Sequence, residues 1–363
     1  MQIETPATSA GPFAHAPTSI QRTMVLVMLA LLPATVFGFW QFGWPAIFLF
    51  LTTLGTAVAA EWVCLRIAGK PQRRYLLDGS AVVAGWLLAL SLPPWAPWWI
   101  GAIGALIAIV VAKQVFGGLG QNIFNPAMVA RVALLISFPL EMTSYVRPLP
   151  IFSPEAPGFW QGISISLGQG GFDAVTGATL LSHVRTELSQ GGTLSDILPG
   201  MAHLFSGAIG TIAGSMGETS ALLILLGGGF LLLKRVISWH IPVALVGSLA
   251  LIATLMNLYD ADRYAGAPYH LVSGATLLVA FFIATDPVTS PVSKSGQILF
   301  GAGCGILVYV IRTWAGYPEG VGFAILLMNA CTPTIDHYLR PRVYGRDRRG
   351  TPIEYADNAE MRK

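Results

Sequence analysis

The chain has 363 residues, of which 54% are hydrophobic and 11% are charged, and its mean hydropathy is +0.63. Soluble domains carry about 25% charged residues, so the composition excludes an ordinary water-soluble protein and predicts an all-α integral membrane protein. The net charge of +3 comes from basic residues in short loops and near the C-terminus. That distribution is typical of membrane topology, and no nucleic-acid partner is expected.

Apolar runs approach the roughly 20 residues that a helix needs to cross a bilayer. We expect ten spans, at about 24–41, 44–66, 78–93, 97–116, 126–140, 219–236, 239–258, 268–285, 296–314 and 320–338. These spans divide the chain into five parts. They are an N-terminal tail (1–23), a five-helix membrane region (24–140), a long polar loop (141–200), a second five-helix region (201–338) and a basic tail (339–363). The first part lacks a basic start followed by an apolar core, so it is interpreted as a tail and not as a signal peptide.

The basic residues orient these spans. With the N-terminus inside, sixteen of the 21 Lys and Arg residues fall on the cytoplasmic side, and Arg131 lies within the fifth span. Only Arg147, Arg185, Arg263 and Arg312 fall outside. The positive-inside rule therefore predicts cytoplasmic termini and an extracytoplasmic 141–200 loop.

The two membrane regions resemble each other weakly. Asp78-Gly79-Ser80-Ala81 opens the third span and Ser273-Gly274-Ala275-Thr276 lies early in the eighth, and Gly-rich segments precede the fifth and tenth spans. Because five is an odd number, the halves would be inverted repeats, as in transporters whose interrupted helices line a site at the repeat interface. A chance similarity is the alternative.

The long loop contains Asp173-Ala174-Val175-Thr176-Gly177-Ala178-Thr179. This stretch resembles the Asp-x-x-Ser/Thr-Gly-Ala-Thr signal at which a flavin transferase joins FMN, through its phosphate, to the last threonine. In this chain that residue is Thr179, and the recognition residues are Asp173, Thr176, Gly177 and Ala178. An ordinary turn followed by a helix cap is the alternative for the last four residues.

An incomplete copy of the signal serves as an internal control. Ser273-Gly274-Ala275-Thr276 has His270 where the aspartate belongs, and it lies inside an apolar run. We interpret Thr276 as a helix-packing residue and His270 as interfacial.

Charged residues within the spans are costly in lipid, so they are expected to face protein or water. Glu61 and Arg131 lie inside spans, whereas Asp286 and Asp336 lie at or near span ends. Arg131, Asp286 and Asp336 are candidates for an ion path or a flavin-binding wall. Helix-end caps at the interface are the alternative for both aspartates. The three cysteines, Cys64, Cys304 and Cys331, are too isolated for an iron–sulfur or zinc site, so no metal and no catalytic group is expected.

Four sequence blocks in combination resemble one family, over about residues 20–340. They are Asp173–Thr179, Gly118-Leu119-Gly120-Gln121-Asn122-Ile123-Phe124-Asn125-Pro126-Ala127-Met128, Ala284-Thr285-Asp286-Pro287-Val288-Thr289-Ser290-Pro291, and the stretch from Tyr317 to Asn329. The blocks look like the D subunits of Rnf electron-transport complexes, and they are similar to the B subunits of sodium-pumping NADH:quinone reductases.

The resemblance implies a covalent FMN on Thr179, placed outside the bacterial inner membrane, and a second, non-covalent flavin such as riboflavin. It implies a complex with further subunits of types A, B, C, E and G that passes electrons between ferredoxin and NAD and moves Na⁺ or H⁺. The chain would be a subunit of this oxidoreductase and not catalytic alone, embedded in lipid and matured by the flavin transferase.

Three alternatives stay open at this point. The chain could be the B-type subunit of the quinone reductase, although its short N-terminal tail favours the Rnf side. It could be a small-solute transporter or channel without redox work, or a passive scaffold within the complex.

Overall fold

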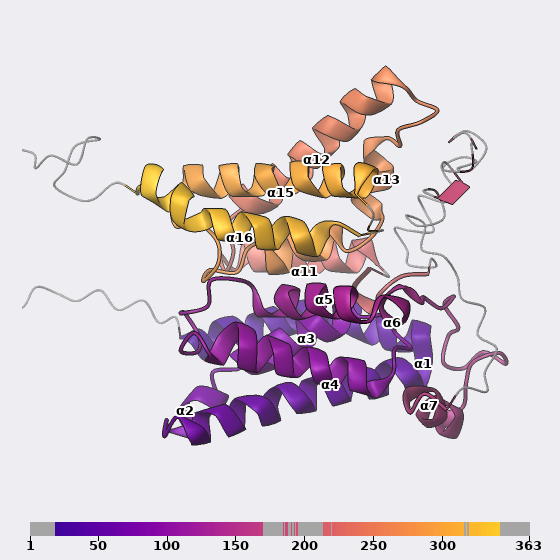
Figure 1. Ribbon diagram of the computed structural model, residues 1–363, viewed down its shortest axis with the longest axis vertical. Coiled ribbons are helices and arrows are strands. Elements are labelled where there is room, and N and C mark those ends of the chain that lie inside the picture. The colour runs from indigo at the N-terminus through magenta and orange to yellow at the C-terminus, as the bar shows by residue number, and fades with distance from the viewer. Residues whose placement is uncertain are drawn as a thin grey trace, which may run out of the picture.

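The computed structural model describes residues 19–169, six positions between 184 and 194, and residues 213–218, 220–315, 317 and 319–341. Within these residues every regular element is a helix, as the composition predicts (Figure 1). Three of these helices, α1, α12 and α15, are long and apolar enough by themselves to cross a membrane.

The helices of the first half begin and end close to the expected spans. They are α1 (Ile20–Ile67), α2 (Gln72–Leu76), α3 (Ser80–Ser91), α4 (Trp98–Leu106), the π-helix η1 (Ile107–Gln114) that continues α4, and α5 (Pro126–Ser137). Two short helices follow, α6 (Pro139–Thr143) and α7 (Phe159–Ser166), and the 3₁₀ turn η2 covers Met216–Glu218.

The second half also follows the expected spans, except that the eighth is interrupted. Its helices are α11 (Ala221–Leu233), α12 (His240–Tyr259), α13 (Ala267–Val272), α14 (Thr276–Leu278), the π-helix η3 (Val279–Ile283), α15 (Lys294–Trp314) and α16 (Val321–Tyr338). The interruption between α13 and α14 falls within the Ser273–Thr276 stretch.

Helix α1 is two helices in one run, because Gly43 has non-helical dihedral angles (φ 69°, ψ −156°). Glycine adopts a positive φ without a steric penalty. The carbonyl groups beside the break accept other hydrogen bonds: Phe42 from the Trp95 indole and Gln41 from the Leu149 N–H, each over 2.9 Å. The break therefore coincides with the turn expected between the first two spans, and its polar backbone is satisfied, as a buried break requires.

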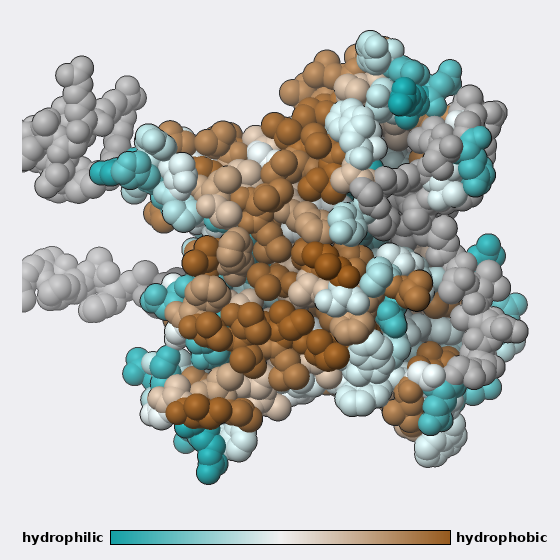
Figure 2. Space-filling model, in the orientation of Figure 1, coloured by the Kyte–Doolittle hydropathy of each residue, from teal (hydrophilic) through white to brown (hydrophobic). Residues whose placement is uncertain are grey.

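The long helices lie side by side with their loops at two opposite ends. Helix α1 begins and α16 ends at the left end in Figure 1, whereas α6, α7 and α13 lie at the other. Figure 2 shows a broad hydrophobic band between these ends and hydrophilic residues toward both of them. A surface divided in this way belongs to a protein whose middle faces lipid.

Helices α5 and α16 join the two halves by reciprocal polar contacts. Arg131 of α5 forms a buried ion pair with Glu319, which lies just before α16. In return, Asn329 of α16 accepts a hydrogen bond from the backbone N–H of Asn125, just before α5, over 3.1 Å. Each helix therefore holds the loop that leads into the other.

A similar arrangement is present at the starts of α3 and α14, in the expected third and eighth spans. A glycine with positive φ precedes a helix there, Gly79 at 79° and Gly274 at 69°. A basic side chain from the following long helix then reaches the polar groups near this glycine. The contacts are Lys113 to the Ser80 hydroxyl (2.7 Å) in the first half, and Arg312 to the carbonyl oxygens of His270 and Ser273 (2.9 and 3.1 Å) in the second.

Candidate functional site

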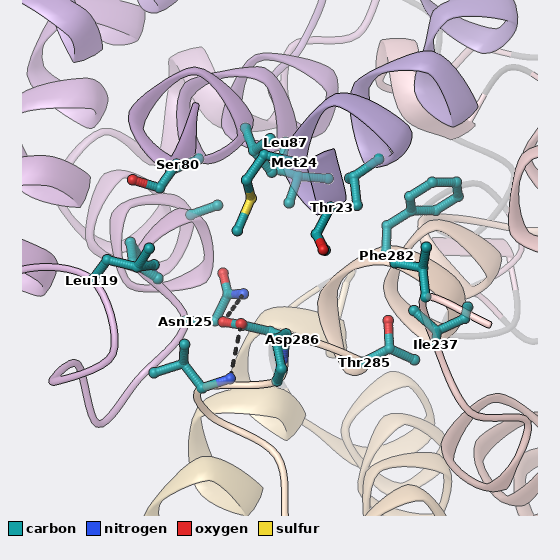
Figure 3. A pocket seen from close by; sticks show the side chains of 18 of the residues that line it. Thr23, Met24, Ser80, Leu87, Leu119, Asn125, Ile237, Phe282, Thr285 and Asp286 are labelled. Carbon is teal, nitrogen blue, oxygen red and sulfur yellow. Dashed lines mark hydrogen bonds between the residues drawn. The ribbon is translucent and has the colours of Figure 1, made fainter. Parts of the chain in front are cut away.

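A cavity lies between the two halves of the chain, at the end where α1 begins and α16 ends (Figure 3). Its cavity volume is about 110 Å³, and the empty space around it, which includes open solvent at its mouth, is about 850 Å³. Residues of α1, α3, η1 and α5 line it from the first half, and residues of α11, η3 and the loop after η3 from the second. Most of the wall is apolar and includes Met24, Val27, Val83, Leu87, Phe281 and Phe282.

Asn125 and Asp286 form one polar part of the wall. The Asn125 side-chain amide donates to the Asp286 carboxylate over 3.4 Å, and Figure 3 shows the two side chains meeting at the cavity. Asp286 also accepts from the Val288 N–H (3.1 Å) and the Thr289 hydroxyl (3.3 Å). Asp286 lies beyond the last helical residue of η3, and burial raises the pKa of its carboxyl against the lowering effect of these three hydrogen bonds.

Lys113 and Ser80 form a second polar part of the wall. The Lys113 ammonium donates to Glu61 Oε1 over 2.9 Å and to Ser80 Oγ over 2.7 Å. Ser80 Oγ in turn donates to Asp78 Oδ1 over 2.6 Å. Lys113 and Glu61 are each only 2% exposed, so the pair compensates two charges that would each be costly if buried alone.

The cavity has the properties of a small-molecule site. Ligand pockets usually have mostly apolar walls and a few polar groups that fix orientation. Here Ser80, Asn125 and Asp286 supply hydroxyl, amide and carboxyl groups within a mostly apolar wall.

The structure brings only one of the three predicted charged candidates to this cavity. Asp286 lines it, whereas Arg131 lies beside Tyr145 and Glu319 in a separate small pocket. Asp336 accepts a hydrogen bond from the Val292 N–H over 3.0 Å and does not line the cavity. The bond joins α16 to the segment before α15 and caps neither helix, because Val292 precedes the N-cap residue Ser293.

The predicted flavin signal, Asp173 to Thr179, lies outside the described residues, so its five site residues stay predictions. Farther along the same loop, the Leu194 N–H donates to the carbonyl oxygen of Asp262 over 3.0 Å. This contact joins the loop to the turn between α12 and α13.

The internal control behaves as predicted at Thr276. Thr276 is fully buried and donates to the carbonyl oxygens of His270 and Ser273, so its interpretation as a packing residue is confirmed. His270 is buried as well: its ring lies against Tyr309, and its carbonyl oxygen accepts a hydrogen bond from Arg312.

Sequence reasoning missed Lys113 as a site residue and Glu319 as the partner of Arg131. Lys113 lies inside the apolar 97–116 run, where a lone charge should have drawn the same attention as Glu61. Its partner is 52 residues away, and Glu319 is 188 residues from Arg131. No local pattern identifies such pairs.

Comparison with known sequences decides the family. The family model described as "NQR2, RnfD, RnfE family" matches residues 7–345. The chain belongs to the NQR2, RnfD, RnfE family. This result confirms the resemblance drawn from the sequence blocks.

Three relatives, each named as the D component of an ion-translocating oxidoreductase complex, are similar over nearly the whole chain or most of it. The one from Halorhodospira halophila is 54% identical over 345 residues, which is 95% of this chain and 97% of the relative. Those from Stutzerimonas stutzeri and Rhodobacter capsulatus are 53% and 51% identical, covering 93% and 83% of this chain and 95% and 84% of the relatives.

Within this member of the NQR2, RnfD, RnfE family, blocks that are distant in sequence meet at the cavity. Asn125 belongs to the 118–128 block and Asp286 to the 284–291 block, and they touch in its wall. Asn329, at the end of the 317–329 block, holds the backbone of Asn125 and the carbonyl oxygen of Thr289. Two of the four blocks that carry the resemblance therefore form this wall, and a third supports it.

Proposed function

We propose that the chain is the D-type membrane subunit of a bacterial ion-translocating oxidoreductase complex, in which it relays electrons between ferredoxin and NAD⁺ and couples them to Na⁺ or H⁺ translocation. The observation that carries this proposal is the 51–54% identity to proteins of that name over 83–95% of the chain. The chain acts only within the complex, whose other members are of types A, B, C, E and G.

The first redox group in this proposal is a covalent FMN on Thr179, installed by a flavin transferase. The complete signal from Asp173 to Thr179 supports it. A phosphate ester on a threonine hydroxyl tethers the cofactor without touching its ring, so the ring's electron chemistry stays available. The remaining phosphate charge suits a loop in water better than a membrane interior.

The second redox group is a non-covalent flavin in the cavity between the two halves. The apolar walls would hold the ring, and Asn125, Asp286 and Ser80 would face its polar atoms. When bound, a flavin accepts and donates one or two electrons. The residues of this chain contribute orientation, exclusion of water and charge compensation.

The architecture proposed for this function is ten transmembrane helices in two inverted five-helix repeats, in the inner membrane with both termini cytoplasmic. The reciprocal contacts of α5 and α16 and the similar breaks at Gly79 and Gly274 support the repeats. Basic residues at the end where α1 begins, such as Arg22, Arg66 and Lys294, support the orientation. This places the cavity toward the cytoplasm and Thr179 outside.

The test is the flavin content of the denatured protein. The complex is produced with its flavin transferase, and in-gel fluorescence and the mass of the peptide containing Thr179 are measured. Wild type should fluoresce and carry the mass of FMN, and Thr179→Val should lose both. Thr276→Val should keep both, because Thr276 only packs and bonds to carbonyl groups. Wild type without fluorescence or added mass would overturn the proposed flavin site.

A further inference from the structure

Lys113 is a charged side chain in the wall of an otherwise mostly apolar cavity. An ammonium group has three donors, and the Lys113 ammonium directs two of them to Glu61 and Ser80. Because Lys113 lines the cavity, its charge acts on whatever the cavity holds. It lies in η1, and π-helical turns within helices often occur at functional sites.

A purely structural role explains this ion pair poorly. Burying two charges costs desolvation, and apolar residues of similar size often stabilise a buried site equally well or better. The pair is also incompletely satisfied, because Glu61 Oε2 is buried without a hydrogen-bond partner. Close to Glu61 in sequence, Ala57 and Ala60 belong to a buried cluster of small apolar side chains with Ala81 and Ala84. The helices could have packed here without charged residues, so the presence of Lys113 points to a role other than stability.

The polar groups of the cavity differ in charge between its two parts. Asn125 and Asp286 present an amide and a carboxyl group, and an ionised Asp286 would oppose a ligand that becomes negative. Lys113 presents a positive charge, which favours a ligand that becomes negative. In a water-excluded site such a charge acts more strongly than in water.

We propose that Lys113 stabilises the negative charge gained by a redox ligand in this cavity when it accepts an electron, and that Glu61 limits this stabilisation. The inference rests on the proposed function, which places a flavin there. In the step itself, one electron passes from a one-electron donor of the complex to the ligand. No bond forms or breaks, and Lys113 keeps its proton.

The arrangement predicts that two variants shift the midpoint potential of the ligand in opposite directions. Glu61→Gln removes the compensating carboxylate, so the Lys113 charge acts more strongly and the midpoint potential of the ligand rises. The double variant Lys113→Met/Glu61→Gln removes the cation and leaves no unpaired charge, so the potential falls. We expect at least a tenfold change in the one-electron reduction equilibrium in each direction, and tenfold corresponds to about 59 mV.

The experiment is a spectroelectrochemical titration that measures the midpoint potential of the bound flavin in the purified complex. The amount of non-covalent flavin is determined separately, after its release by acid. The matched control is Arg131→Met/Glu319→Gln, which neutralises a buried ion pair that does not line the cavity. It should shift the potential of the bound non-covalent flavin far less than either test variant does.

The outcomes separate the two proposals. Opposite shifts in the test variants with a small shift in the control support the inference. Wild type that releases no non-covalent flavin overturns the cavity assignment and the inference with it. If wild type releases flavin but Glu61→Gln has an unchanged or lowered midpoint potential, the inference about Lys113 is overturned. The assignment of the flavin to the cavity then stands. If the double variant loses its flavin, the Glu61→Gln variant alone tests the inference: a raised midpoint potential supports it, and an unchanged or lowered one overturns it.

Discussion

The side-chain amide of Asn125 donates to the carboxylate of Asp286 over 3.4 Å, although 161 positions separate the two residues. Asn125 also caps α5 by accepting a hydrogen bond from the Met128 N–H, and its own N–H donates to Asn329. One residue therefore starts a helix of the first half and binds two segments of the second. This is why the cavity wall depends on both halves being packed together.

Asp286 should be essential for the integrity of that wall. Asp286→Ala would leave the Val288 N–H, the Thr289 hydroxyl and the Asn125 amide without their acceptor. A buried polar group without a partner costs about 1–3 kcal/mol. We expect a lower Tm in detergent and less acid-released flavin, with Asp286→Asn less affected because it keeps one oxygen.

The control for this prediction is Asp336→Ala, which loses one hydrogen bond, to Val292, away from the cavity. It should keep the flavin and lose only about 0.5–1.5 kcal/mol. Equal flavin content in Asp286→Ala and wild type would contradict the role assigned to Asp286.

The buried ion pair of Arg131 and Glu319 should show strong coupling. Removing one partner leaves an uncompensated buried charge, at a cost of about 3–5 kcal/mol. Arg131→Met and Glu319→Gln should therefore each lower the Tm markedly, whereas the double variant should recover most of the loss. A double-mutant cycle by thermal unfolding measures this, and additive effects would show that the pair does not act as a unit.

Gly79 should not tolerate a side chain. Its φ of 79° costs an L-residue about 1–2 kcal/mol, and a Cβ there would lie 3.2 Å from Met24 Cβ. Gly79→Ala should thus lower stability by about 1–2 kcal/mol or more. The matched control is Gly229→Ala in α11, where no atom lies within 4 Å of the new Cβ. The control should be neutral or slightly stabilising, because alanine favours a helix over glycine; similar losses at both sites would refute the strain argument.

The proposed topology predicts which surface residues a membrane-impermeant maleimide reaches. In a background with Cys64, Cys304 and Cys331 replaced, Glu155→Cys should be labelled in intact spheroplasts. Arg73→Cys should be labelled only after the membrane is opened. Both side chains are exposed; Arg73 belongs to α2 and Glu155 lies between α6 and α7, and these helices lie at opposite ends in Figure 1. Labelling in the reverse order would place the loop with Thr179 in the cytoplasm.

Much of the helical arrangement was predictable from local pattern. The break at Gly43, the start of α5 at Pro126 and the end of α16 near Tyr338 all lie close to the bounds expected from apolar runs and helix breakers. These signals are local, since each span must satisfy its own backbone in lipid. The eighth span was the exception, because its interruption at Gly274 is hidden in an apolar run and stabilised by a side chain of α15.

The candidate site was only partly predictable. Asp286 was found because a carboxylate at the edge of an apolar run is conspicuous. The flavin signal ending at Thr179 is a contiguous motif and needs no structure to be noticed, but it stays a prediction. Lys113 was missed because its importance comes from lining a cavity shared by two halves.

By itself, the sequence determined that the chain is a helical membrane protein, approximately where its helices begin and end, and which family it resembles, because hydropathy, helix breakers and motif blocks are properties of short stretches. Only the tertiary structure decided that Lys113 pairs with Glu61, that Arg131 pairs with Glu319, and that Asp286 faces a cavity while Asp336 does not. The physical reason is that a buried charge requires a partner, but the partner's identity follows from which helices pack together and at what rotation.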